Sequence, residues 1–238
     1  MKLDILAFGA HPDDVELGCS GTLAKEISLG KKVGIIDLTR GELGTRGSVE
    51  IRNSESEAAS KILGISVREN LDMRDGFFIN DENHQLKVIE MIRKYQPEIV
   101  ICNAINDRHI DHAKGSKLVS NACFLSGLVK IKTMSNNVSQ EAWRPKLVYH
   151  YIQWKNIEPD FVVDISNFID KKEAAILAYS SQFYNPNSNE PETPIATKNF
   201  LDSIHNRSRE LGRLVGTEYA EGFTVERYLA VNSLGDLI

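Results

Sequence analysis

Short apolar runs that end in polar residues recur along the first half of the chain. Residues 3–8, 33–38 and 98–102 are each largely apolar, which is the pattern of a strand covered on both faces of a parallel sheet. Segments with apolar residues at helical spacing lie between these runs. The alternation predicts an α/β fold with a mainly parallel sheet and right-handed crossovers, to whose edge the second half of the chain adds strands and helices.

The same patterns predict where the other elements lie and indicate a single domain. Helices are expected at residues 15–29, 50–63, 82–95, 113–125, 170–183 and 199–215. Further strands are expected at residues 67–73, 146–153, 161–165 and 227–231. Residues 133–145 are predicted to be a polar connector, residues 185–194 a proline-rich loop and residues 219–223 a compact turn. Because no repeat divides the sequence, we expect a single domain over residues 1–238.

The composition is that of an ordinary soluble globular protein, with 42% hydrophobic residues and 28 Lys and Arg against 33 Asp and Glu. No basic tract supplies the field that nucleic-acid binding needs, so no nucleic-acid partner is expected. No apolar run approaches the roughly 20 residues of a bilayer span, and Asp4 interrupts a would-be signal segment, which favours a cytoplasmic protein with no membrane partner. The cysteines, Cys19, Cys102 and Cys123, share no C-x-x-C spacing, so we expect buried, inert thiols.

Ionisable side chains crowd the end of the first strand. His11, Asp13 and Asp14 follow the apolar run within four residues, at the strand edge where open α/β sheets bind their ligands. Such a cluster needs a cation to organise it, and imidazole and carboxylate both suit zinc. The alternative is a structural role, in which the two aspartates only cap the following helix.

A second polar segment follows the strand at 98–102 and carries His109, Asp111 and His112. Because the first and fourth strands of such a sheet can be neighbours, the two segments are expected to meet. His11, one of the two aspartates and one of the two later histidines would then bind a catalytic metal with an open water position. The spare aspartate would accept a proton from water, the spare histidine would stabilise the oxyanion, and Asp111 would orient that ring.

A glycine-rich loop and two further histidines give weaker indications of a functional site. Residues 39–47 hold three glycines among charged and hydroxyl groups and form a second candidate site loop, after which Ser48 is expected to cap a helix. His84 and His205 stand among polar residues and are interpreted as solvated side chains.

Three motifs together, residues 10–18, 39–42 and 109–112, resemble those of the LmbE-like or PIG-L zinc-dependent N-acetylglucosamine deacetylases. Residues 181–183, 199–216 and 219–223 look like the branch that deacetylates N-acetylglucosaminyl-L-malate in bacillithiol biosynthesis. The resemblance therefore covers nearly the whole chain. It implies a Rossmann-like, three-layer fold, a small-molecule substrate and a homo-oligomer, a trimer or a hexamer.

The resemblance also implies roles for individual residues. Zinc would be held by His11, Asp14 and His112, and Fe²⁺ or Co²⁺ would suit the same ligands. Asp13 would be the general base, His109 would stabilise the tetrahedral intermediate, and Asp111 would be the orienting carboxylate beside it. In this chain Ile110 stands where many relatives carry proline, which alters loop stiffness more than ligand chemistry.

Substrate recognition is expected to involve arginines, since an arginine fork can bind both oxygens of a carboxylate. Arg52 matches a substrate-binding arginine of the branch, and Arg108 and Arg46 are further candidates for the acidic end of a malate conjugate. Some relatives use a tyrosine just before the second motif as an oxyanion donor. This chain has Asp107 and Arg108 there, so that role is not assigned. Glu42 is a candidate for the sugar hydroxyls.

Two alternatives differ in function. The same chemistry would serve another acetylated sugar, such as N,N'-diacetylchitobiose, or a mycothiol-type conjugate. A non-catalytic sugar- or nucleotide-binding module would instead hold a structural ion in a closed site. A dinucleotide site is rejected, because the segment after the first strand lacks the G-x-G-x-x-G spacing.

Overall fold

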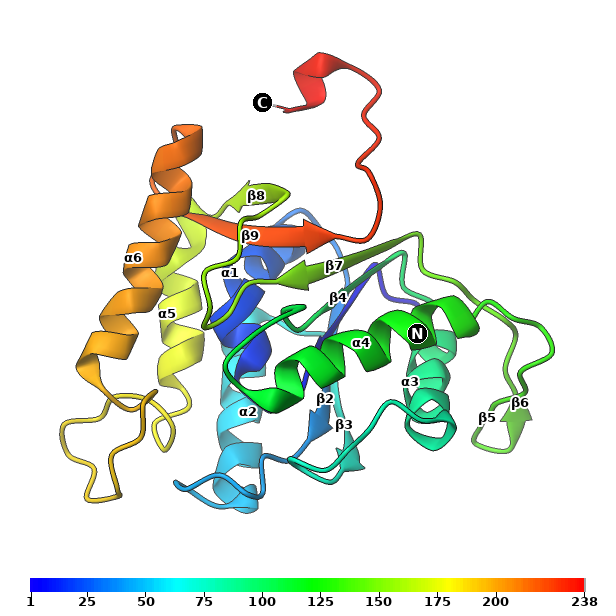
Figure 1. Ribbon diagram of the computed structural model, residues 1–238, viewed down its shortest axis with the longest axis horizontal. Helices are drawn as coiled ribbons and strands as arrows, with labels where there is room; N and C mark the ends of the chain where they lie inside the picture. Colours follow the sequence, from blue (N-terminus) through cyan, green and yellow to red (C-terminus); the bar gives the residue numbers. More distant parts are fainter. Residues whose placement is uncertain (238) are drawn as a thin grey trace.

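A seven-stranded sheet between two helical layers organises the computed structural model, which describes residues 1–237 (Figure 1). Its strands, in chain order, are β1 (Ile5–Gly9), β2 (Val33–Thr39), β3 (Val67–Met73), β4 (Ile99–Cys102), β7 (Leu147–Tyr151), β8 (Phe161–Asp164) and β9 (Ala220–Val225). The spatial order is β3-β2-β1-β4-β7-β9-β8. The first five of these are parallel, and β9 runs antiparallel to both β7 and β8. The predicted fold class is confirmed.

The helices cover the two faces of the sheet. They are α1 (Asp14–Ser28), α2 (Val49–Leu63), α3 (Glu82–Tyr95), α4 (Ile110–Leu125), α5 (Ile169–Leu177) and α6 (Lys198–Val215), with 3₁₀ turns at Ser166–Phe168 and Leu234–Leu237. One core cluster joins β1, β2 and β4 to α3 and α4, and another joins the opposite face of these strands to α1. A third cluster packs α2, α5 and α6 together beside α1. This third cluster places α6 next to the carboxyl edge of the sheet.

The strand at the carboxyl-terminal end of the chain lies earlier than predicted. Residues 219–223 were expected to turn and 227–231 to form a strand, but the strand is β9 and residues 227–231 are irregular. The acidic Glu221 obscures this strand in the sequence. In the structure Glu221 is buried, contacts Lys172 and accepts hydrogen bonds from the amides of Gly21 and Thr22, so its charge is compensated inside the fold.

Three other elements differ from the prediction. Helix α5 ends at Leu177 instead of continuing to residue 183, and the polar connector at 133–145 contains a small hairpin, β5 (Met134–Ser135) with β6 (Val138–Ser139). Helix α4 begins at Ile110, three residues earlier than expected, because the His109 side chain accepts a hydrogen bond from the Asp111 amide and caps it. The cap on α2 is as predicted, with Ser48 accepting from the Ile51 amide.

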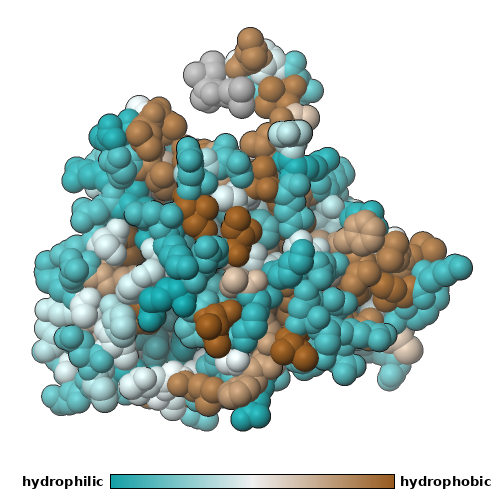
Figure 2. All heavy atoms as spheres, viewed as in Figure 1, coloured by the Kyte–Doolittle hydropathy of each residue, from teal (hydrophilic) through white to brown (hydrophobic). Residues whose placement is uncertain are grey.

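Exposed apolar side chains gather over the C-terminal end of α4 and the segment that follows it (Figure 2). Phe124 and Val129 belong to this group. Such patches are typical of protein interfaces, yet the trimer or hexamer stays a prediction that light scattering would test. The three cysteines are buried and free, as expected. Among residues 1–237, no helix has both the length and the apolar character of a bilayer span.

Candidate metal centre and substrate cleft

The two predicted motifs meet because β1 lies between β2 and β4. The chain leaves β1 at Gly9 and leaves β4 at Cys102, so the residues after each strand share one sheet edge. The Ala10 amide donates a hydrogen bond of 2.9 Å to Oδ1 of Asn103, which ties the two segments together. The expected neighbourhood of the first and fourth strands is confirmed.

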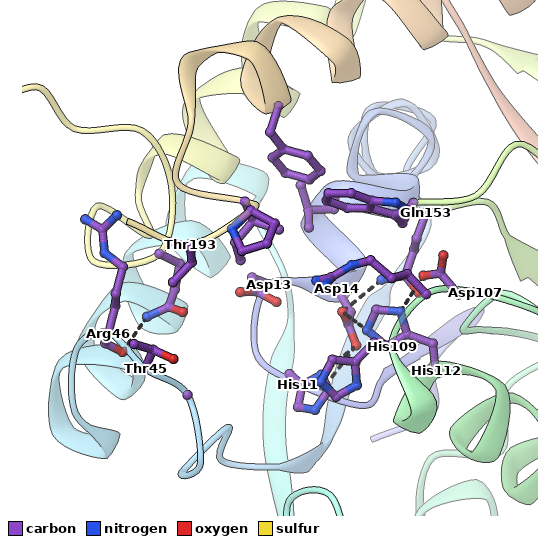
Figure 3. Close-up of a pocket in the computed structure, with 18 of the residues that line it drawn as sticks. His11, Asp13, Asp14, Thr45, Arg46, Asp107, His109, His112, Gln153 and Thr193 are labelled. Atoms are coloured by element: carbon purple, nitrogen blue, oxygen red, sulfur yellow. Dashed lines mark hydrogen bonds and ion pairs between the residues drawn. The ribbon is translucent and has the colours of Figure 1, made fainter. Parts of the chain in front are cut away.

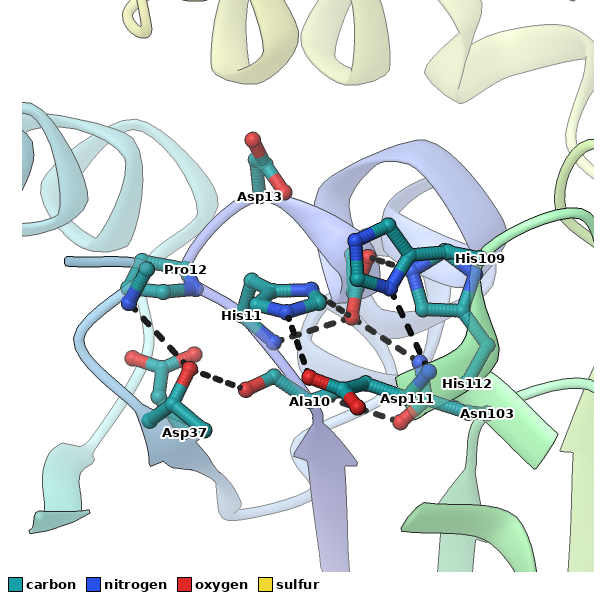
Figure 4. A network of polar contacts seen from close by, with 12 residues as sticks. Ala10, His11, Pro12, Asp13, Asp37, Asn103, His109, Asp111 and His112 are labelled. Carbon is teal, nitrogen blue, oxygen red and sulfur yellow. Dashed lines mark hydrogen bonds and ion pairs between the residues drawn. The ribbon is translucent and has the colours of Figure 1, made fainter. Parts of the chain in front are cut away.

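The centre of the site is the carboxylate of Asp14, which lies between the imidazoles of His11 and His112. Figure 4 shows these two histidines together with His109 and Asp111. Its Oδ2 is 3.5 Å from Nδ1 of His11, and its Oδ1 is 3.1 Å from Nε2 of His112. Burial opposes ionisation of Asp14, but these imidazoles outweigh it and hold the pKa of the carboxyl well below its usual range. His11, His109 and His112 also place ring nitrogens within 4.8 Å of one another. Two imidazoles and a carboxylate are a donor set that fits a catalytic divalent metal such as zinc, so these residues are candidates to hold one.

Each of the two imidazoles beside Asp14 has a carboxylate behind its other nitrogen. Nδ1 of His112 contacts Asp107, and Nε2 of His11 is 3.0 Å from Asp75. Carboxylates in this position fix the ring orientation and the tautomer of a metal-binding histidine. Asp75, from the loop after β3, was not singled out in the sequence, because a lone aspartate in a loop carries no motif.

The Asp111 carboxylate contacts His11, whereas it was expected to orient His109. Its carboxylate accepts from the Gly76 amide at 2.7 Å, contacts Lys114 at 2.6 Å and lies 3.5 Å from Nε2 of His11. Only its backbone amide reaches His109, at 3.3 Å from Nδ1. Burial and the imidazoles of His11 and His112 lower the pKa of His109. The neutral ring therefore accepts at Nδ1 and carries its proton on Nε2.

Two neutral amides hold the far side of the Asp14 carboxylate. Asn103 donates to Oδ2 at 2.9 Å and Gln153 donates to Oδ1 at 2.8 Å. The Asn103 amide also donates to Oε1 of Gln153 at 2.9 Å, so the amides brace each other. All three side chains are buried. Sequence patterns gave no signal for this pair, since single amides at strand ends are common.

Asp13 stands apart from His11, Asp14 and His112 and is held by an arginine. Its backbone adopts φ 120°, a region that non-glycine residues rarely occupy. Nη2 of Arg52 donates to Oδ2 of Asp13 at 2.7 Å and also to the Pro12 carbonyl, which stabilises this conformation. Burial raises the pKa of Asp13 to about 7, although Arg52 opposes the shift. A carboxyl group that titrates near neutral pH suits a general base.

A cavity of about 480 Å³ opens over these groups (Figure 3). His11, Asp13, Asp14, His109 and His112 line it, together with four arginines, Arg46, Arg52, Arg108 and Arg207. Glu42 does not line it, because its carboxylate accepts from the Asp75 amide at 2.8 Å.

The arginines differ in how far their forks are already used. Arg46 is bound to Ser188 at 2.7 Å and to Glu190 at 3.4 Å, and Arg52 is bound to Asp13. Arg108 is exposed and stacks over the Trp154 ring at 4.5 Å, with no ion pair within residues 1–237. Of the three arginines predicted from the sequence, Arg108 is therefore the one whose fork can receive a carboxylate without breaking an existing contact.

Comparisons with known proteins identify the family. The crystal structure of the conserved protein TT1542 from Thermus thermophilus is similar, with a TM-score of 0.85 and 37% identity over 97% of this chain and 98% of that chain. The family model PIG-L, GlcNAc-PI de-N-acetylase, matches residues 6–123. This chain belongs to the PIG-L family.

Two curated relatives of this PIG-L family chain are deacetylases by name. The uncharacterized deacetylase YaiS of Escherichia coli (strain K12) is 38% identical over 114 residues, which are 45% of this chain and 61% of YaiS. The chain thus spans about three fifths of the length of that relative. The diacetylchitobiose deacetylase of Thermococcus kodakarensis is 29% identical over 189 residues, 75% of this chain and 70% of that protein.

Proposed function

We propose that this PIG-L family protein is a metal-dependent deacetylase that hydrolyses the acetamide of an N-acetylglucosamine conjugate. The observation that carries the proposal is the meeting of Asp14, His11 and His112 at the floor of a cavity that the carboxylate of Asp13, held by Arg52, also lines. A closed structural ion site would leave no general base and no cavity over the ligands. The family membership supports the same reaction class.

The metal would be held by His11, Asp14 and His112, and zinc fits this nitrogen and oxygen donor set. When bound, such a metal supplies Lewis-acid polarisation of the acetamide carbonyl and of the attacking water. Fe²⁺ and Co²⁺ prefer similar ligands, so reconstitution of the metal-free protein with each ion would identify the metal that supports turnover.

The chain's own residues provide the proton transfers. Asp13 accepts a proton from the attacking water, whose oxygen forms the new bond to the carbonyl carbon. His109 donates a hydrogen bond from Nε2 to the carbonyl oxygen as negative charge develops there. When the C–N bond breaks, the proton held by Asp13 passes to the departing nitrogen, and the products are acetate and a free amine. Asp111 acts through His11, which it helps to orient.

For the substrate we propose N-acetylglucosaminyl-L-malate, as in bacillithiol biosynthesis. The free fork of Arg108 at the rim of the cavity supports this choice, because a guanidinium binds the two oxygens of a carboxylate in plane. N,N'-Diacetylchitobiose is the second candidate, supported by the similarity to the Thermococcus kodakarensis enzyme. It carries no carboxylate and would not use Arg108 in this way.

The test is amine release by the purified protein from N-acetylglucosaminyl-malate, diacetylchitobiose and N-acetylglucosamine, each assayed with and without a chelator. We expect turnover of the malate conjugate, its loss on chelation and its recovery when zinc is restored. Turnover that survives complete metal removal would contradict the metal-dependent reaction. No amine release from any of the three substrates would contradict the substrate class.

A further inference from the structure

Helix α1 is broken a few residues after Asp14. Cys19 has φ −149° and ψ 15°, which are not helical angles, so α1 consists of a first segment, residues 14–18, and a second segment, residues 20–28. The first segment begins at the metal centre, and Leu17 within it lines the catalytic cavity. The break therefore separates the direction of this short segment from that of the rest of the helix.

A buried ion pair binds the backbone groups at this break. In a continuous helix the amide of Gly21 would donate to the carbonyl of Leu17. Here the amide donates to Oε1 of Glu221 at 3.0 Å, and the carbonyl accepts from Nζ of Lys172 at 2.8 Å. The next amide, of Thr22, donates to Oε2 of Glu221 at 2.7 Å, and Nζ of Lys172 is 2.5 Å from Oε1 of Glu221. Each charge is thus bound to its partner and to one side of the break.

The two charges come from elements outside α1. Lys172 lies on α5 and Glu221 on β9, which both pack against α1 (Figure 1). Both residues are almost fully buried, with exposed fractions of 2% and 3%. Burial of two charges has a desolvation cost that their attraction offsets only in part, and apolar side chains of similar size are often at least as stable in their place. Stability alone therefore does not account for this pair, whereas a broken helix requires both a donor and an acceptor.

The ion pair is connected to the metal centre through the backbone of Leu17. The Leu17 amide donates to the carbonyl of Asp13 at 2.9 Å, and the Leu17 carbonyl accepts from Lys172. Asp13 has φ 120°, a conformation that persists only where surrounding contacts hold it. Arg52 holds its side chain, and the Leu17 amide holds its carbonyl. A displacement of Leu17 would therefore move Asp13 and, through the next peptide, Asp14.

We propose that Lys172 and Glu221 are positioning residues, which keep α1 broken and thereby hold Asp13 and Asp14 in place at the metal centre. Without the two charges, the amide and the carbonyl at the break bond each other again, α1 becomes continuous and its first segment changes direction. The inference rests on the proposed deacetylase function only for its effect on turnover. Helix geometry and zinc affinity are measured independently of that function.

The test replaces both charges with apolar side chains of similar length, in the double variant Lys172→Met and Glu221→Met. We expect this variant to be about as stable as wild type in thermal unfolding. In the metal-free protein the ¹³Cα chemical shift of Cys19 should move to the helical range, and zinc affinity should fall by about tenfold or more in a competition titration with a chelator. The matched control, Lys94→Met and Glu69→Met, removes an ion pair of 2.8 Å between α3 and β3 and should change neither quantity.

A second variant keeps the proposal testable if the double variant does not fold. Glu221→Gln retains one acceptor oxygen, but its NH₂ group cannot accept from the second amide at the break. Zinc affinity should then fall severalfold, and unchanged affinity in the folded variant would overturn the positioning role. In zinc-saturated samples kcat should fall while KM changes by less than about twofold, because neither Lys172 nor Glu221 lines the catalytic cavity.

The outcomes separate this inference from the proposed function. If wild type releases no amine, yet loss of the ion pair moves the Cys19 shift and weakens zinc binding, the deacetylase function fails and the positioning role stands. If wild type deacetylates and the double variant matches it in Cys19 shift or in zinc affinity, the positioning role is overturned and the function stands. A pair that only stabilises the fold would lower the unfolding temperature and leave zinc affinity and kcat of the folded protein unchanged, which would also overturn the role.

Discussion

The metal centre and an outer groove between residues 152–157 and the first half of α6 lie side by side but are built in opposite ways. At the metal centre nearly every polar group is buried and already bound, as Asp14 is by His11, His112, Asn103 and Gln153. In the outer groove the amides of Asn199 and Asn206 are exposed and unbound within residues 1–237. Preformed contacts keep reacting groups in place before substrate arrives, while free groups leave room for different ligands. We therefore expect catalysis to tolerate few substitutions at the metal centre, whereas the outer groove should tolerate more of them.

The largest effect is expected for the base at the metal centre. Asp13→Asn keeps the shape and the contact with Arg52 but removes the proton acceptor, so kcat should fall by about a hundredfold or more. Metal content, measured by atomic absorption, should match wild type because Asp13 is not a ligand. Unchanged kcat would remove Asp13 from the role of base.

The amide pair behind Asp14 should control metal affinity. Gln153→Ala leaves Oδ1 of Asp14 without its amide donor and should weaken zinc binding by about 10–100-fold in a competition titration with a chelator. Gln140→Ala, which removes an amide that donates to the Glu90 carbonyl far from the site, is the matched control and should leave affinity unchanged. Equal affinities for Gln153→Ala and wild type would show that the pair does not position the ligand.

Metal binding should depend on pH through His112. Burial opposes protonation of this ring, but Asp14 and Asp107 outweigh it and raise the pKa to about 9 in the metal-free protein. Below pH 9 a metal must displace this proton, so apparent affinity should rise by about tenfold per pH unit between pH 6 and 8 for each proton displaced. Calorimetry in buffers of different ionisation enthalpy would count the released protons, and no release would contradict the assignment.

The smallest effect is expected at the rim. Arg108→Ala should raise KM for N-acetylglucosaminyl-malate by about tenfold, because the carboxylate loses its fork, and should leave KM for diacetylchitobiose nearly unchanged. Arg74→Ala removes a guanidinium that stacks on Phe77 away from the cavity and serves as control. Equal changes for both substrates would show that Arg108 does not select the acid.

The sequence predicted the parts of the site that stand in motifs after apolar runs. His11, Asp13, Asp14, His109 and His112 all reach one cavity, since parallel strands deliver their ends to one edge. Asp75, Asn103 and Gln153 could not be predicted, because their roles come from side chains that meet only in three dimensions.

Two features depend on local contacts that a residue pattern does not show. The Asp111 carboxylate contacts the Gly76 amide, Lys114 and His11, while its backbone amide donates to the His109 side chain that caps α4. Likewise β9 carries a charge at Glu221 that Lys172 compensates, so its sequence lacks the apolar run of a buried strand.

The most direct test is a stoichiometric metal titration of the chelator-treated protein, in which bound zinc and amine release from N-acetylglucosaminyl-malate are measured on the same samples. We expect activity to rise in proportion to bound zinc and to level off at about one ion per chain, as a single site of three protein ligands requires. His112→Ala should abolish both the high-affinity ion and the activity. Full activity in the metal-free protein would contradict the metal-dependent deacetylase. So would a tightly bound ion that leaves the activity of both wild type and His112→Ala unchanged.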